Sequence, residues 1–356
     1  AASDVYKRQG HIQGIAIDQN REYIYCSFTT VLIKMDLKGQ LIGTVTGLAG
    51  HLGCIAYNMS DGCVYGSLEY KHDCIGTGIL KQQNSQLDFQ DGFYIAIFDV
   101  SKINRIGMDA EKDEIMTTVY LNEVASDYTA INHRYGCSGI DGTTFGPDVE
   151  NPGNKKFLYV AYGIYSDTER EDNNYQVILK YDIEGWNQYK MPLSQENMHK
   201  SGPQIPDGKY FVYTGNTTFG IQNLEYDPYT NSFLAAVYRG SKPNFKNYSL
   251  FMIDASIKPQ FEMLKGTNEV GKVLRLSHKG LYDKENNIYG WQFEYGATGL
   301  IALGDGYYYI SHDWNKDPYF GSEIKRYRWD GKSPFQLCES LYCCLLYTSD
   351  AADDLT

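Results

Sequence analysis

The sequence predicts an all-β fold, a β-propeller with five visible four-stranded blades. Three observations predict it: a short aromatic and β-branched pattern returns five times, each copy follows an apolar strand, and each precedes a strand that ends in an acidic residue. Repeats of this kind need their neighbours to bury both faces, so they indicate a repeat architecture. The five copies stand at 23–28, 63–68, 157–162, 233–238 and 307–312.

The first unit shows the pattern most clearly. Its four strands are expected at 14–18, 23–28, 31–36 and 40–45, with turn signals between them. Four short strands joined by tight turns make one propeller blade. Later units start near residues 54, 139, 221 and 299.

The acids that end the third strands are expected to form turns rather than a site, because Asp side chains bond to their own backbone. They are Asp36, Asp99, Asp182 and Asp254. These positions lie further apart than the about 40–50 residues of a minimal blade, so the units carry insertions.

The two ends are set apart from the fold. Residues 1–9 and 344–352 can be encoded by the two strands of one DNA string, which resembles a transposon-type sequencing adapter translated as protein. We therefore treat 1–9 and 344–356 as adapter-derived and expect 10–343 to form a single propeller domain. A sixth blade, or a signal peptide, would lie beyond these ends, so the sequence leaves the compartment open.

Composition excludes several partners. The net charge is −12 and Lys and Arg do not form blocks, which argues against nucleic acid and anionic membrane surfaces. No apolar run approaches the roughly 18 residues of a transmembrane helix. The 32 Tyr fit either packed sheet faces or aromatic platforms for sugars, so their number does not decide between them.

A site is expected where loops gather. In a propeller, the loops that enter the inner strands and the loops after the second strands emerge on one face, and loops carry function. The loops after the second strands are expected to be long at 69–92, 163–174, 239–248 and 312–321, and long loops are often functional.

The catalytic candidates at this mouth are Asp141, His11, His51, Glu69 and His72. Asp141 is expected on an inner strand, where burying an acid without a partner is costly and therefore often functional. Glu69 and His72 resemble an acid–base group or a solvated loop. His11 and His51 occupy equivalent repeat positions and fit either a structural cap or a catalytic role.

The substrate-binding candidates are Gln13, Gln222, Asn223, Thr298 and His312. No metal ligands are assigned, although a divalent cation would suit the His residues. The alternating acids of 167–172 fit either Ca²⁺ coordination through oxygens or a solvated charge run.

The run at 14–39 reads Gly-Ile-Ala-x-Asp, then Tyr-Ile-Tyr-x-Ser, then Asp-x-x-Gly. It resembles the broad superfamily of NHL-like, YVTN-like and gluconolactonase-like propellers. The spaced Glu, Asn and Asp metal set of gluconolactonases does not align with this chain, so no functional residue is carried over.

Two functions follow as hypotheses. The first is a hydrolase or lyase acting on a carbohydrate-like or other small polar substrate, with Asp141 or Glu69 as the carboxylate and His11, His51 or His72 for proton transfer or metal binding. The second is a non-catalytic propeller scaffold that binds a ligand or a protein. A catalytic site needs two titratable groups within reach of one substrate atom, whereas a binding site needs only shape and aromatic surface.

Overall fold

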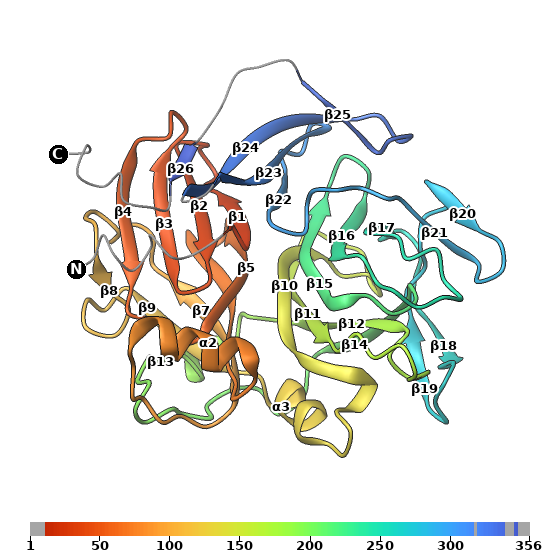
Figure 1. Ribbon diagram of the computed structural model, residues 1–356, viewed down its shortest axis with the longest axis horizontal. Helices are drawn as coiled ribbons and strands as arrows, with labels where there is room; N and C mark the ends of the chain where they lie inside the picture. Colours follow the sequence, from red (N-terminus) through yellow and green to blue (C-terminus); the bar gives the residue numbers. More distant parts are fainter. Residues whose placement is uncertain (1–10, 317–318, 339–344, 348–356) are drawn as a thin grey trace.

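Five β-sheets lie around a common axis in the computed structural model, which describes residues 11–316, 319–338 and 345–347 (Figure 1). This arrangement confirms the predicted β-propeller. The innermost strand of each sheet lies near the centre, and each one contacts the next around the ring. These strands are β1 (Gly14–Ile17), β5 (His51–Asn58), β10 (Cys137–Pro147), β15 (Thr218–Asp227) and β22 (Leu300–Ala302). Because β22 also contacts β1, the ring of described strands closes at five blades.

The second strands coincide with the repeated sequence pattern and pair antiparallel with the inner strands. They are β2 (Tyr23–Phe28), β6 (Cys63–Tyr70), β11 (Lys156–Ile164), β16 (Ser232–Tyr238) and β23 (Tyr307–Lys316). The third strands follow as β3 (Val31–Asp36), β7 (Gly92–Phe98), β12 (Tyr175–Tyr181), β17 (Leu250–Asp254) and β24 (Tyr319–Trp329). The acids that end these strands form the expected turns: Asp36 Oδ1, for example, accepts hydrogen bonds from the amides of Lys38 and Gln40 at 2.9 and 2.8 Å.

Four of the five blades have a fourth strand. These strands are β4 (Leu41–Thr46), β9 (Met116–Tyr120), β14 (Gly208–Tyr213) and β25 (Phe335–Leu337). The expectation of four strands is wrong for the fourth blade, whose sheet contains only β15, β16 and β17 among the described residues. The chain after β17 instead forms strands on the neighbouring blade and a separate hairpin of β20 (Leu281–Asp283) and β21 (Ile288–Gly290).

Three blades carry an extra edge segment that comes from the next blade along the chain. β8 (Met108–Asp109) pairs with β4, β13 (Met191–Pro192) pairs with β9, and β19 (Val270–Val273) pairs with β14 and carries β18 (Gln260–Met263). These edge segments cover backbone groups that an open sheet edge would leave unpaired.

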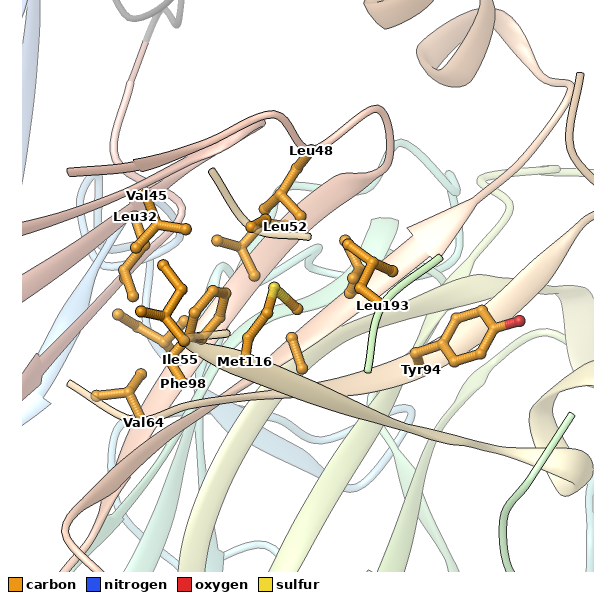
Figure 2. Close-up of a cluster of buried hydrophobic side chains, with 14 of the residues drawn as sticks. Leu32, Val45, Leu48, Leu52, Ile55, Val64, Tyr94, Phe98, Met116 and Leu193 are labelled. Carbon is orange, nitrogen blue, oxygen red and sulfur yellow. The ribbon is translucent and has the colours of Figure 1, made fainter. Parts of the chain in front are cut away.

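Buried side chains fill the space between neighbouring blades. Figure 2 shows the cluster between the first two blades, where Leu32 and Val45 from the first pack near Ile55 and Phe98 from the second. Leu193, which follows the edge segment β13, completes the same cluster. The apolar interfaces therefore run between blades, as the repeat pattern requires.

The insertions contain two α-helices, α2 (Cys74–Gln83) and α3 (Asn122–Thr129), and two 3₁₀ turns, η1 (Arg134–Gly136) and η2 (Trp186–Gln188). The long loop expected at 69–92 therefore contains a helix. The long loop expected at 312–321 is wrong, because β23 and β24 pair as a hairpin out to Lys316 and Tyr319. No helix in the described part of the chain is long and apolar enough to cross a membrane.

Residues 1–9 and most of 344–356, set apart as adapter-derived, lie outside the described residues. Within the second segment, β26 (Leu345–Tyr347) pairs antiparallel with β24.

Candidate functional site

A cavity of about 290 Å³ opens at the mouth of the propeller, and six of the ten candidate site residues line it. These six are His11, Gln13, His51, Glu69, Asp141 and Gln222. They come from three inner strands, one second strand and the segment that enters β1. We call this space the mouth cavity.

Irregular inner strands shape the mouth cavity. The pairing register shifts between Leu52 and Ile55 in β5, between Ile140 and Thr143 in β10, and between Thr218 and Asn223 in β15. Bulges of this kind bend a strand and re-aim its side chains, and they are common beside functional sites. Three of the five inner strands therefore depart from regular pairing where they reach the mouth.

A buried ion pair forms one wall of the mouth cavity. Glu69 lies near the end of β6, and Lys71 and Asp73 follow at every second position in the segment after the strand. The ion pairs of Lys71 with both acids show that all three side chains lie on the same side. Lys71 Nζ lies 2.5 Å from Glu69 Oε1 and 3.2 Å from Asp73 Oδ2, and it donates to Ser138 O at 2.8 Å. Burial opposes the ammonium charge, but the two carboxylates outweigh it and raise the pKa of Lys71.

The second oxygen of Glu69 fixes the neighbouring inner strand. Glu69 Oε2 accepts a hydrogen bond from the amide of Ile140 at 3.0 Å. A Cβ atom at Gly139, whose φ is +129°, would lie 2.0 Å from this oxygen, so only glycine fits. Burial raises the pKa of Glu69 while Lys71 acts in the opposite direction.

Asp141 lies deeper, on β10, and is buried. Its Oδ1 accepts a hydrogen bond from the amide of Cys54 at 3.3 Å. A Cβ atom at Gly53 would lie 2.1 Å from the same oxygen, so the backbone approaches the carboxyl group closely. Burial, and then the charge of Glu69, raise the pKa of Asp141 well above its ordinary value, because both disfavour the charged carboxylate.

His51 faces the same cavity as a neutral imidazole. Burial, reinforced by the charge of Lys71, lowers the pKa of His51 to about 3. Its Nδ1 is buried without a hydrogen-bond partner among the described residues, and Glu69 Oε1 lies 3.8 Å away, too far for a hydrogen bond. An unpaired buried nitrogen costs free energy, and such sites deserve a functional explanation.

His11 stands at the rim of the mouth cavity. Its Nε2 lies 3.3 Å from both Gln13 Nε2 and the hydroxyl of Tyr238. The ring of Phe219 packs edge-on against Tyr238 with a centroid distance of 6.2 Å. Phe219 is 47% exposed and has a φ of 64°, a left-handed conformation that is unfavourable for a bulky residue. The rim thus presents an aromatic surface beside the polar groups.

The other four candidate residues do not line the mouth cavity. His72 is exposed and its Nδ1 lies 2.8 Å from Asp91 Oδ1, outside the cavity that Glu69 and Lys71 line. Asn223 is buried beneath the cavity, where its amide donates to Gln13 O at 2.9 Å and to Ala297 O at 2.7 Å.

Thr298 and His312 lie on the fifth blade. Thr298 Oγ1 is 3.1 Å from Ser311 Oγ. His312 stacks on Tyr295 with a centroid distance of 3.6 Å and lies 2.7 Å from the hydroxyl of Tyr327. Burial, followed by the charge of Lys325, lowers the pKa of His312 to about 4. These contacts make His312 part of an aromatic cluster.

Eight residues that line the mouth cavity were not among the sequence candidates, and three of them add charge or aromatic surface: Lys71, Phe219 and Tyr238. The alternation of Glu69, Lys71 and Asp73 could have identified Lys71, since residues two apart on an extended chain share a face. Phe219 has no such signal, because the exposure of its ring depends on the irregular pairing of β15.

A half-buried carboxyl lies on the inner strand β15. Glu225 on β15 accepts hydrogen bonds from the amide of Ala302 at 3.0 Å and from Thr144 Oγ1 at 3.2 Å. Burial raises the pKa of Glu225 to about 8.

The described residues contain no group of three or more His, Cys, Asp or Glu side chains arranged to hold a metal ion. In the acidic run at 167–172, Asp172 Oδ1 lies 2.7 Å from Arg170 Nε. The divalent cation therefore stays an untested expectation.

Comparison with known proteins assigns the chain to no family. No protein-family model matches the chain, and no curated protein matches it. Among solved structures, it is similar to the holo form of the pyranose dehydrogenase PQQ domain from Coprinopsis cinerea, at 9% identity over 84% of this chain and 79% of that chain, with a TM-score of 0.39. It is also similar to PpgL, a periplasmic gluconolactonase of Pseudomonas aeruginosa, at 10% identity over 94% of this chain and 87% of that chain, with a TM-score of 0.32. The propeller assignment rests on the sheet topology of the chain itself.

Proposed function

We propose that the mouth cavity is the active site of an acid–base enzyme, a hydrolase or lyase that acts on a small, neutral, carbohydrate-like substrate. The observation that carries the proposal is the pairing of a buried carboxylic acid, Asp141, with a neutral imidazole, His51, in one cavity. Two titratable groups whose environments push their pKa values in opposite directions are typical of a proton donor and a proton acceptor.

The remaining groups suit a polyhydroxylated ligand. Gln13 and Gln222 supply amide donors and acceptors, and Phe219 and Tyr238 supply aromatic surface for the apolar face of a sugar ring. The Glu69–Lys71 pair leaves little net charge in the cavity, so a neutral substrate fits better than an anionic one. In this assignment Asp141 donates a proton to the leaving group, and His51 accepts one from water or from a carbon atom of the substrate.

The test is an activity screen with two kinds of readout. Hydrolysis of glycosides and lactones is followed by leaving-group release and by acid production, whereas a lyase product is followed by the absorbance of its new conjugated double bond. For any substrate that turns over, Asp141→Asn should reduce kcat at least about 100-fold, the range for loss of a positioned acid. The matched control is Asp91→Asn, which alters a half-buried carboxyl outside the cavity and should leave kcat unchanged.

A non-catalytic scaffold is the second candidate, and one observation favours it. Both oxygens of Glu69 and one oxygen of Asp141 already accept bonds from Lys71, Ile140 and Cys54, so these acids also serve the fold. Sugar binding without any turnover across the screen would support the scaffold and contradict catalysis.

A further inference from the structure

A second and larger cavity, of about 910 Å³, lies on the third blade. Its lining includes the rings of His133 and Tyr165, the carboxylates of Asp167, Glu171 and Asp172, and Arg170. We call it the blade 3 cleft. The acidic run at 167–172 contributes to it, but none of the ten catalytic and substrate-binding candidates lines it, and the function proposed above does not use it.

Two chain segments connect the lining of the blade 3 cleft with that of the mouth cavity. Gly163 at the end of β11 lines the mouth cavity, and Tyr165, two residues on, lines the cleft. Ser138 lines the mouth cavity, and His133, just before η1, lines the cleft. Burial raises the pKa of the Tyr165 hydroxyl while Lys71 lowers it, so a charge of the mouth cavity acts on a residue of the cleft.

Hydrogen bonds and an ion pair made by Arg170 and Lys242 connect the walls of the blade 3 cleft. The guanidinium of Arg170 pairs with both oxygens of Asp172, at 2.7 and 2.8 Å, and also donates to the carbonyls of Asn132 and His133 on the facing wall, at 2.5 and 3.0 Å. Beneath the loop, the buried Lys242 ammonium bonds to the backbone carbonyl of Arg170 and to side-chain oxygens of residues 173 and 174. A cleft held in this way is formed before a ligand arrives, which lowers the entropic cost of binding.

The lining of the cleft selects a class of ligand. The guanidinium of Arg170 is engaged within the protein, whereas Asp167 and Glu171 are exposed and form no ion pair with the described residues. Exposed carboxylates disfavour an anionic ligand and accept hydrogen bonds from hydroxyl groups. The rings of Tyr165 and His133, which lie 5.1 Å apart, add a surface for the apolar faces of sugar rings.

From these observations we propose that the blade 3 cleft binds the further units of a neutral oligosaccharide whose terminal unit occupies the mouth cavity. The two sizes agree with this division, because small-molecule sites span about 300–1,000 Å³ and the two cavities lie near the lower and upper ends of that range. The identity of the reacting unit rests on the proposed function, but binding by the cleft does not require turnover.

The experiment is isothermal titration with monosaccharides and tetrasaccharides of five neutral series: α-1,4-glucose, β-1,4-glucose, β-1,4-xylose, β-1,4-mannose and β-1,4-N-acetylglucosamine. In at least one series the tetrasaccharide should bind at least 10-fold more tightly than its monosaccharide. Tyr165→Ala should remove this gain and leave monosaccharide affinity within 2-fold. Tyr229→Ala is the matched control, because Tyr229 is an exposed tyrosine outside both cavities.

A second variant guards against misfolding of Tyr165→Ala. Asp167→Asn combined with Glu171→Gln changes only exposed side chains and should likewise weaken the tetrasaccharide selectively. The proposal is overturned if tetrasaccharides bind no more tightly than monosaccharides, if the cleft variants weaken both equally, or if no series binds.

The proposed function fails in a different way. Length-dependent binding without any product keeps the blade 3 cleft and removes catalysis. Turnover with no dependence on chain length keeps catalysis and removes the cleft.

Discussion

Replacing Lys71 by Met tests the electrostatic organisation of the mouth cavity. The side chains of Lys71 and Glu69 are each only 5% exposed, and their charged atoms lie 2.5 Å apart. Removing one partner of a buried pair costs about 3–5 kcal/mol, because the other charge stays buried without compensation. Glu69 can avoid that cost by taking up a proton. From an ordinary pKa of about 4.5, protonation at pH 7 costs about 3.4 kcal/mol at about 1.4 kcal/mol per pH unit. We therefore expect Lys71→Met to lose about 3 kcal/mol of unfolding free energy at pH 7.

The pH dependence follows from the same argument. In Lys71→Met the folded-state pKa of Glu69 lies above its unfolded value. The contribution of Glu69 to stability is therefore most favourable at low pH and is lost as the pH rises. The deficit relative to the unaltered protein should therefore shrink to about 1 kcal/mol at pH 5. In the unaltered protein the pKa of Lys71 is raised, so its contribution persists throughout this range.

Urea denaturation at pH 5 and pH 7 measures both effects. The double variant Lys71→Met with Glu69→Gln should recover most of the loss at pH 7, because no buried charge remains at that position. Lys102→Met is the control: its partner Asp99 lies 3.5 Å away on the surface, and such pairs contribute about 1 kcal/mol or less. A deficit that is under about 1 kcal/mol at pH 7, or that does not change with pH, would refute the reasoning.

Three further predictions concern single positions. Glu225→Gln should stabilise the protein at pH 9 by about 2–5 kcal/mol in thermal or urea unfolding and have little effect at pH 4. The reason is that the folded protein with Glu225 loses stability as the pH rises from the ordinary pKa of the carboxyl through its folded-state pKa of about 8. Equal effects at both pH values would contradict this. Gly139→Ala should destabilise the protein by more than about 2 kcal/mol, since the new Cβ would collide with Glu69 Oε2. The control Gly78→Ala in α2 adds a Cβ with no atom within 4 Å and should stabilise the protein by about 0.5–1 kcal/mol. Similar unfolding midpoints for the two variants would rule this out. Phe219→Gly should relieve about 1–2 kcal/mol of left-handed strain yet weaken sugar binding in titration; lower stability would contradict the strain, and unchanged sugar affinity would contradict an aromatic platform.

Local patterns predicted most of the blades correctly. Alternating apolar residues and Asp or Gly turns are encoded within a few positions, so the second strand Tyr23–Phe28 and the third strand Val31–Asp36 match their predicted limits. The same reasoning placed His11, His51, Glu69 and Asp141 on one face, and the structure brings them into one cavity. Whether these residues bind or transform a substrate stays a prediction.

What the sequence did not reveal is a capped helix, the short edge segments and the orientation of His72. Helix α2 contains Gly76 and Gly78, which disfavour a helix, but Asp73 caps its first turn by accepting from the amides of Ile75 and Gly76. The edge segments are only two to four residues long and carry no periodicity. His72 was mistaken for a mouth residue because its chain neighbours face the cavity, whereas its own ring is exposed and lies against Asp91.

The edge segments also set an order of events during synthesis of the chain. β4 ends at Thr46, but its partner β8 begins only at Met108. In the same way β9 pairs with β13 and β14 pairs with β19, which follow much later in the sequence. A ribosome adds about 5–20 residues per second, so roughly 60 residues of delay correspond to about 3–12 s. During that interval the finished blade presents an unpaired strand edge, the kind of surface that templates aggregation and recruits chaperones. Truncating the chain directly after a complete blade would make this transient state permanent, so fragments should be cut after the next edge segment.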